Sequence, residues 1–346
     1  MTDFTKTKQI LTAIQIDINK YNCIDAMFLT LADYYNRGVE LMSIGSWGFD
    51  YQPNYTEKNK FGEKLFSGMT MPSRKVLSHY HGIDVDWQEN VTWDELKKAI
   101  DSHIKENRPI GIYINGYDCP WNPAYRKAKV DHYCLVTSYD PETKNYNCID
   151  SYYRHIPMHQ GKSQNFIDEQ LLPEENLKQG FRDYISFALK EPVSHYSLKQ
   201  IFKDVQLRPE DFQKRKHVFE NIAQFGRDLS QTLDINLEVE QCNGQIESTK
   251  LYRFFVQQSQ RRQNYTDALR FLKENAWDVT PEMADDLETI TAEFDRVAGQ
   301  WTKMSVLMLK LYLTKKEMLR EKMGALAEQI SREELELFKK IVKIGT

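Results

Sequence analysis

Residues 21–36 read YNCIDAMFLTLADYYN, and this stretch decides the fold that the sequence predicts. Apolar residues recur there at helical spacing and would bury one face of a helix: Ile24, Met27, Phe28, Leu31 and Tyr35. Asn22 is a favourable N-cap, and Arg37-Gly38 supplies a basic last turn and a stop. Cys23 therefore falls in the first turn, where the positive end of the helix dipole favours the thiolate. This position suits a nucleophile; a buried thiol without a chemical role is the alternative.

The composition is that of an ordinary globular protein. A chain of 346 residues predicts about two domains, and the formal net charge of −4 gives no general reason to bind nucleic acid or an anionic membrane. No signal-peptide core is seen at the N-terminus, and the most apolar run, residues 306–313, is too short to span a bilayer. The cysteines are odd in number and lack metal-type spacing, which predicts reduced thiols in a cytoplasm: Cys23, Cys119, Cys134, Cys148 and Cys242.

The first half of the chain predicts a mixture of helices and antiparallel strands. The pattern indicates a short strand or extended lead at 5–20, helices at 71–82 and 92–107, a strand at 110–114, a hairpin over 131–151 and a strand at 184–189. Residues 38–70 predict a long loop region. Its aromatic side chains are predicted to be exposed or to line a cleft, and packing as a satellite core is the alternative: Trp47, Phe49, Tyr51 and Tyr55.

Beyond residue 192 the pattern becomes helical, with few glycines and prolines and with charges on the outer faces. Helices are predicted at 197–206, 209–236, 245–275, 281–313 and 315–342. We therefore predict a catalytic domain over residues 1–192 and a helical-bundle domain over residues 193–346.

The hairpin brings two candidate catalytic residues together. Because its strands are antiparallel, His132 at the start of the first and Asp150 at the end of the second meet at one edge of the sheet. Thiol acyl transfer needs a thiolate, an imidazole and a group that orients the imidazole. Cys23, His132 and Asp150 supply all three. Cys119, in a loop, is the rival nucleophile, and two further thiols are predicted to be core residues inside strands: Cys134 and Cys148.

Four short stretches carry a resemblance to a known family: PIGIYINGY at 109–117, DHYCLV at 131–136, YD at 139–140 and CID at 148–150. They resemble the N-terminal domain of the butirosin-biosynthesis H-type acyltransferases, over roughly residues 10–190. The resemblance implies an α+β papain-like fold, related to bacteriocin leader peptidases, followed here by the all-α domain. It also implies transfer of an acyl group from the phosphopantetheine thioester of a carrier protein to an amine. Closthioamide-type thiotemplate amide synthetases are similar in plan and use a diamine.

By this resemblance Cys23 is the acyl-accepting nucleophile, His132 the base and Asp150 the residue that orients it. Papain-like enzymes carry an oxyanion-hole glutamine six residues before the cysteine, where this sequence has Asp17. Gln15, eight residues before, is the candidate for that role, and the backbone N–H of Cys23 is the second donor.

Further expectations concern the cleft and the partners. Loop aromatics are predicted to line the substrate cleft: Trp47, Tyr117 and Trp121. Two basic stretches, 126–129 and 213–216, are predicted to meet an acidic acyl or peptidyl carrier protein, ordinary solvated charges being the alternative. A small amine is the expected acceptor. We expect no metal, no nucleotide and no other cofactor, because the thioester supplies the activation energy, and the sequence leaves the oligomeric state open.

Two other functions fit the same residues. A cysteine peptidase that trims a leader peptide would use an identical triad and would cleave peptides without a carrier protein. A non-catalytic binding module would use the helical bundle as its partner surface, with the three residues close together by coincidence.

Overall fold

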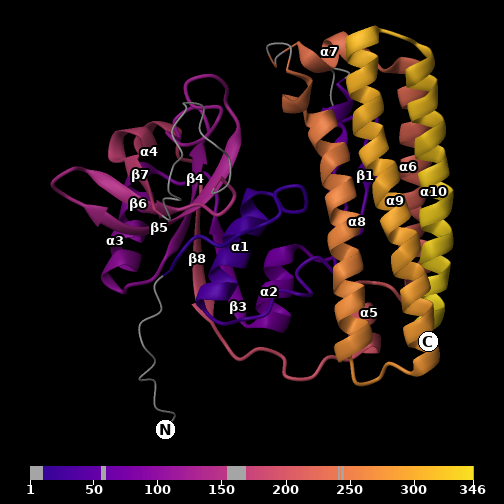
Figure 1. The fold of residues 1–346 in the computed structure, drawn as a ribbon, viewed down its shortest axis with the longest axis horizontal. Helices are drawn as coiled ribbons and strands as arrows, with labels where there is room; N and C mark the ends of the chain where they lie inside the picture. The colour runs from indigo at the N-terminus through magenta and orange to yellow at the C-terminus, as the bar shows by residue number, and fades with distance from the viewer. Residues whose placement is uncertain (1–10, 56–59, 154–168, 241, 243–244, 346) are drawn as a thin grey trace. The chain divides into compact units, whose positions relative to one another are not determined.

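The computed structural model describes residues 11–55, 60–153, 169–240, 242 and 245–345 (Figure 1). The chain forms two compact units, Met1–Val39 with Leu77–Pro192 and Glu40–Val76 with Val193–Thr346. Residues 5–10 of the expected lead segment lie outside the described residues, and residues 11–17 form no regular element.

The first unit is built on one antiparallel six-stranded sheet with the strand order β3-β8-β4-β5-β6-β7. The strands span Ile83–Gln88 (β3), Ile110–Asn115 (β4), Asp131–Asp140 (β5), Asn145–Ile149 (β6), Gln170–Pro173 (β7) and Tyr184–Leu189 (β8). The helices span Cys23–Tyr34 (α1), Ser73–His81 (α2), Trp93–Lys105 (α3) and Glu174–Gly180 (α4). The predicted α+β class is confirmed, whereas β3, β7 and α4 were not predicted.

Helix α1 begins where the sequence predicts it. The Asn22 side-chain oxygen accepts hydrogen bonds from the backbone N–H groups of Ile24 at 2.9 Å and Asp25 at 3.0 Å. The helix packs against β5. Its Met27 side chain lies so close to the backbone of Gly111 in β4 that a β-carbon at position 111 would be 2.7 Å from the Met27 sulfur. The helix ends at Tyr34, before the expected Arg37-Gly38, and Asn36 after the C-cap residue Tyr35 has a left-handed φ of 51°.

One face of the sheet forms an apolar core with helices α3 and α4. Ile110, Ile112 and Ile114 of β4 pair with Val136, Cys134 and His132 of β5, so these residues share that face. Leu96 and Ile100 of α3 and Leu177 of α4 pack with them. Cys134 and Cys148 are buried in this cluster, and their prediction as core thiols is confirmed.

The second unit is mainly helical, with helices at Leu198–Asp204 (α5), Phe212–Thr232 (α6), Ile235–Val239 (α7), Lys250–Asn275 (α8), Pro281–Thr314 (α9) and Met318–Ile344 (α10). Three 3₁₀ turns lie at Phe61–Glu63 (η1), Pro209–Asp211 (η2) and Ile246–Ser248 (η3). The five predicted helices are present, and α6, α8, α9 and α10 lie side by side (Figure 1). Within the described ranges, no helix combines the length and apolar character needed to cross a membrane.

Residues 40–76 fold with these helices, although our predicted boundary at residue 192 assigns them to the catalytic domain. They form a two-stranded ribbon of Asp50–Tyr51 (β1) and Leu65–Phe66 (β2). Trp47 is 2% exposed and contacts aromatic rings of α6, α8, α9 and α10: Phe219, Tyr265, Phe294 and Phe338. Burial of such large aromatic surfaces is what holds this segment in the helical unit.

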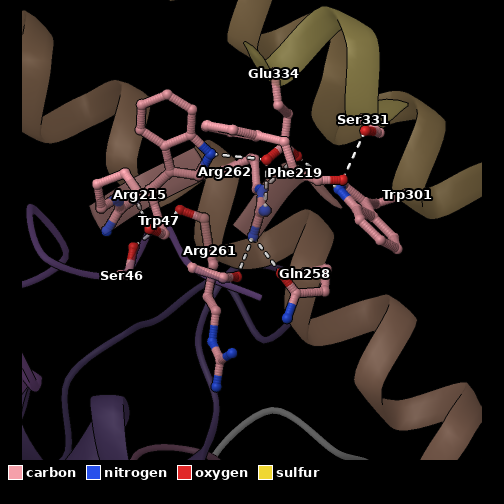
Figure 2. A network of polar contacts seen from close by, with 11 residues as sticks. Ser46, Trp47, Arg215, Phe219, Gln258, Arg261, Arg262, Trp301, Ser331 and Glu334 are labelled. Carbon is pink, nitrogen blue, oxygen red and sulfur yellow. Dashed lines mark hydrogen bonds and ion pairs between the residues drawn. The ribbon is translucent and has the colours of Figure 1, made fainter. Parts of the chain in front are cut away.

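A fully buried ion pair lies beside Trp47 (Figure 2). The Glu334 carboxylate of α10 accepts hydrogen bonds from Arg262 Nε at 3.0 Å and from an Arg262 terminal nitrogen at 2.8 Å, and neither side chain is exposed. The same carboxylate accepts the indole N–H groups of Trp47 at 2.8 Å and Trp301 at 3.0 Å. Since both charges are removed from water, removal of one partner leaves the other uncompensated.

Glu334→Ala should therefore lower the free energy of unfolding of the second unit by about 3–5 kcal/mol, because Arg262 and two indole N–H groups lose their acceptor. Tryptophan fluorescence during denaturant unfolding measures the loss. Glu336→Ala is the control, because this glutamate lies on the same helix with its side chain 63% exposed. Equal unfolding midpoints for the two variants would contradict this account of the core.

Candidate active site

Cys23 is the first residue of α1, and its side chain is partly exposed. Its backbone N–H belongs to the first turn, where the amides have no acceptor within the helix. The capped helix start thus holds, at one place, a thiol and a backbone N–H that has no acceptor within the helix.

His132 is the second residue of β5, and Asp150 directly follows β6. The His132 Nε2 atom lies 2.6 Å from Asp150 Oδ2, and the two side chains are 1% and 2% exposed. The adjacency of these residues, expected from the antiparallel hairpin, is present in the structure. A histidine and a carboxylate at this distance in a buried place form a strong, charge-assisted hydrogen bond when the imidazole is protonated.

The Cys23 sulfur acts on the His132 imidazole and favours its protonated form. Because Nε2 faces Asp150, the other ring nitrogen, Nδ1, is the one left for the sulfur. Burial disfavours the imidazolium, but the Asp150 carboxylate and the Cys23 sulfur outweigh this effect and raise the pKa of His132 to about 10. The structure therefore brings Cys23, His132 and Asp150 into one row, in which His132 is hydrogen-bonded to Asp150 and interacts electrostatically with the Cys23 sulfur.

Asp150 and its neighbour Ser151 connect this row to the rest of the unit. The Asp150 Oδ1 atom accepts the backbone N–H groups of Tyr152 at 3.1 Å and Tyr153 at 3.4 Å. The Ser151 hydroxyl lies 2.6 Å from that of Thr30 on α1 and accepts the Ile14 N–H at 3.0 Å. These bonds fix the end of β6 against the helix that carries Cys23.

Two tyrosines next to Asp150 were missed by the sequence analysis. The ring centroid of Tyr153 lies 4.8 Å from that of His132, and the ring centroid of Tyr152 lies 6.4 Å from it. They cover part of the imidazole and exclude water from its surroundings. Their position in the sequence, directly after Asp150 and Ser151, could have identified them as neighbours of the site.

The rival nucleophile Cys119 is fully buried. Burial, with the nearby negative charge of Asp150 as a second cause, raises the pKa of the Cys119 thiol well above its ordinary value. A thiol held neutral in this way is a poor nucleophile, so the structure favours Cys23.

The remaining predicted site residues have other surroundings. Gln15 is exposed, and among the described residues no hydrogen bond joins it to Cys23, His132 or Asp150. Trp121 is buried and donates its indole N–H to Asp150 Oδ2 at 2.6 Å, rather than lining an open cleft. Tyr117 is half-buried and packs under the Arg126 guanidinium, 5.3 Å from its ring centroid.

Trp47, also predicted to line the cleft, lies in the core of the second unit. It packs there as an apolar ring with one satisfied N–H group and offers no accessible surface to a substrate. The alternative reading of the loop aromatics as core residues therefore describes Trp47, Phe49 and Tyr51, whereas Tyr55 is 59% exposed.

The first basic stretch is exposed at Arg126, Lys127 and Lys129, and it ends three residues before His132. Arg126 forms an ion pair with Asp118 at 2.9 Å. In the second stretch, Arg215 is buried and donates to the Trp47 carbonyl at 2.5 Å, so it contributes nothing to a charged surface. Among the described residues, no group of three or more His, Cys, Asp and Glu side chains could hold a metal ion.

Residues 34–151 match the family model described as butirosin biosynthesis protein H, N-terminal. The resemblance identified in the sequence is thereby confirmed over this range. The matched range contains His132 and Asp150, and it begins at the last residue of α1, after Cys23. It also contains residues 40–76, which fold with the helical unit. No curated protein matches the sequence.

The raised pKa of His132 predicts how stability depends on pH. An unfolded histidine has a pKa of about 6.5, so the stability that protonated His132 contributes is fully present below about pH 6.5 and is lost as pH rises through 10. His132→Gln should therefore lower the thermal unfolding midpoint most at pH 6, and the difference from wild type should shrink by pH 10. A difference that stays constant between pH 6 and pH 10 would contradict a protonated His132.

Proposed function

We propose that this chain is an amide-forming acyltransferase of secondary-metabolite biosynthesis with a papain-like catalytic unit. It takes an acyl group from the phosphopantetheine thioester of a carrier protein, holds it on Cys23 and passes it to an amine. The observation that carries this proposal is the buried His132–Asp150 hydrogen bond together with the Cys23 sulfur that acts on the same imidazole. The match to the butirosin biosynthesis protein H family supports the biosynthetic context.

In the first step the Cys23 thiolate attacks the thioester carbonyl. The carbon–sulfur bond to pantetheine breaks as the bond to Cys23 forms, and His132 gives its proton to the leaving pantetheine sulfur. The backbone N–H of Cys23 is the proposed donor to the oxyanion, since the first turn leaves it without an acceptor in the helix. The proposal leaves Gln15 out because its side chain is exposed and, within the described part of the chain, no hydrogen bond joins it to Cys23, His132 or Asp150.

In the second step the amine attacks the acyl-Cys23 thioester. Neutral His132 takes a proton from the amine as the carbon–nitrogen bond forms, and the Cys23 sulfur leaves. The thioester supplies the free energy, so the proposal includes no nucleotide, metal or other cofactor. Tyr152 and Tyr153 beside His132 support the exclusion of water, which would otherwise hydrolyse the intermediate.

A papain-like peptidase remains the second candidate, since the same row of residues would cleave a peptide. The family match favours the acyltransferase. The two functions differ in their substrates: the transferase needs a thioester and an amine, and the peptidase needs only a peptide and water.

Cys23→Ala should lower amide formation by about 10³-fold or more, because the acyl group loses its acceptor. The assay mixes the protein with acyl-pantetheine thioesters and a panel of mono- and diamines and measures amides by liquid chromatography and mass spectrometry. Cys242→Ala, which removes the other partly exposed thiol, is the control and should keep full activity. Cleavage of peptides by the wild type, without amide formation from any thioester, would favour the peptidase.

We further propose that Lys127 and Lys129 attract the acidic carrier protein to the first unit. Lys127→Glu/Lys129→Glu should raise KM for the carrier-bound acyl group by about tenfold, with kcat and the KM for the free acyl-pantetheine unchanged. The control is Lys98→Glu/Lys105→Glu, an equal charge change at exposed sites on α3. Equal effects of the two double variants would assign the change to net charge instead.

A further inference from the structure

The indole of Trp121 touches the same carboxylate oxygen as the imidazole of His132. Trp121 Nε1 donates to Asp150 Oδ2 at 2.6 Å, and His132 Nε2 lies 2.6 Å from that oxygen. The other oxygen, Oδ1, accepts two backbone N–H groups, from Tyr152 and Tyr153. Trp121 is therefore the one side chain besides His132 for which the described residues record a hydrogen bond to Asp150.

The loop that carries Trp121 is fixed by its own sequence, Cys119-Pro120-Trp121-Asn122-Pro123. The side chain of Cys119 is buried, and the Asn122 N–H donates to the Cys119 carbonyl at 3.0 Å. The two prolines restrict the backbone on both sides of this turn. The 119–123 turn thus places the Trp121 indole N–H at Asp150.

A buried carboxylate keeps its charge only where donors replace the water it has lost. If Asp150 lost a donor, its negative form would be less stable, and the proton of the His132 imidazolium would shift toward the carboxylate. The positive charge would then move away from the Cys23 sulfur, and the thiolate would lose its counter-ion. One indole N–H group thus affects the nucleophile through two other residues.

We propose that Trp121 is a positioning residue of the active site: its indole N–H holds Asp150 as the oriented anion that keeps a proton on His132 beside the Cys23 thiolate. This proposal rests on the proposed function only in the role given to Cys23. The sequence suggested that Trp121 lines the substrate cleft. The proposal gives it a positioning role instead, because the indole is buried and its N–H donates to Asp150.

Other titratable groups surround these three residues and need to be accounted for. They come from the Trp121 loop, from β6 and from the residues after β6: Cys119, Cys148, Tyr152 and Tyr153. Burial raises the pKa of the Cys119 thiol and of both tyrosine hydroxyls above their ordinary values. Cys148 is fully buried in the apolar core. Because these raised pKa values keep the Cys119 thiol and both tyrosine hydroxyls neutral below about pH 8, these groups do not cause a change in Cys23 reactivity in that range.

The test compares Trp121→Phe with the wild type by the rate at which iodoacetamide alkylates Cys23 as a function of pH, with Cys23 identified by peptide mapping. Loss of one hydrogen bond to a buried anion should raise the pH of half-maximal alkylation by about one unit. Trp93→Phe is the matched control, because Trp93 packs against the same apolar core and contacts Phe181 without reaching Asp150. Its alkylation profile should coincide with that of the wild type.

An alkylation profile of Trp121→Phe that coincides with the wild type, in a protein that remains folded by circular dichroism, would overturn the proposal. If Trp121→Phe fails to fold, Trp121→His keeps a ring N–H donor, and its profile should lie nearer the wild type than that of Trp121→Leu. Equal profiles for these two variants would also overturn the proposal. Alkylation needs no acyl substrate, so a wild type that alkylates as expected yet transfers no acyl group would refute the proposed function and leave the role of Trp121 intact.

Discussion

The Asp150 carboxylate is the point at which the separate elements of the first unit meet. It accepts hydrogen bonds from β5 through His132, from the 119–123 loop through Trp121, and from the backbone of Tyr152 and Tyr153. A buried carboxylate with fewer donors would be costly, so the loop and the strand ends are required to converge. The same convergence sets the direction of the His132 ring and hence the nitrogen available to Cys23.

The second unit also contains a buried carboxylate that several donors satisfy, but there it stabilises the core instead of orienting a candidate catalytic residue. Glu334 is also a buried carboxylate with four hydrogen bonds, two of them from indole N–H groups. There the partner of the carboxylate is the guanidinium of Arg262, whereas the partner of Asp150 is an imidazole, the side chain suited to proton transfer. Trp47 brings the 40–76 segment to Glu334, which explains why this segment folds with helices that lie far from it in sequence.

Much of the candidate site could be predicted from local rules. The cap at Asn22 and the apolar spacing behind it locate Cys23 on a helix start, and hairpin geometry alone makes His132 and Asp150 neighbours. The positions of Trp47 and Trp121 could not be predicted in this way, because each depends on a carboxylate distant in the sequence. An aromatic residue in a loop carries no local sign of whether its ring is exposed or buried. The sequence also does not distinguish Lys127, which is exposed, from Arg215, which is buried.

The central claim is that an acyl group is held on Cys23. Intact-protein mass spectrometry after mixing the protein with an acyl-loaded carrier, followed by peptide mapping, tests it most directly. The account predicts a mass increase equal to the acyl group, located on the peptide that contains Cys23 and removed when an amine is added. Amide formation with the acyl group found on another residue, or with no acyl-enzyme during rapid-quench sampling, would contradict it.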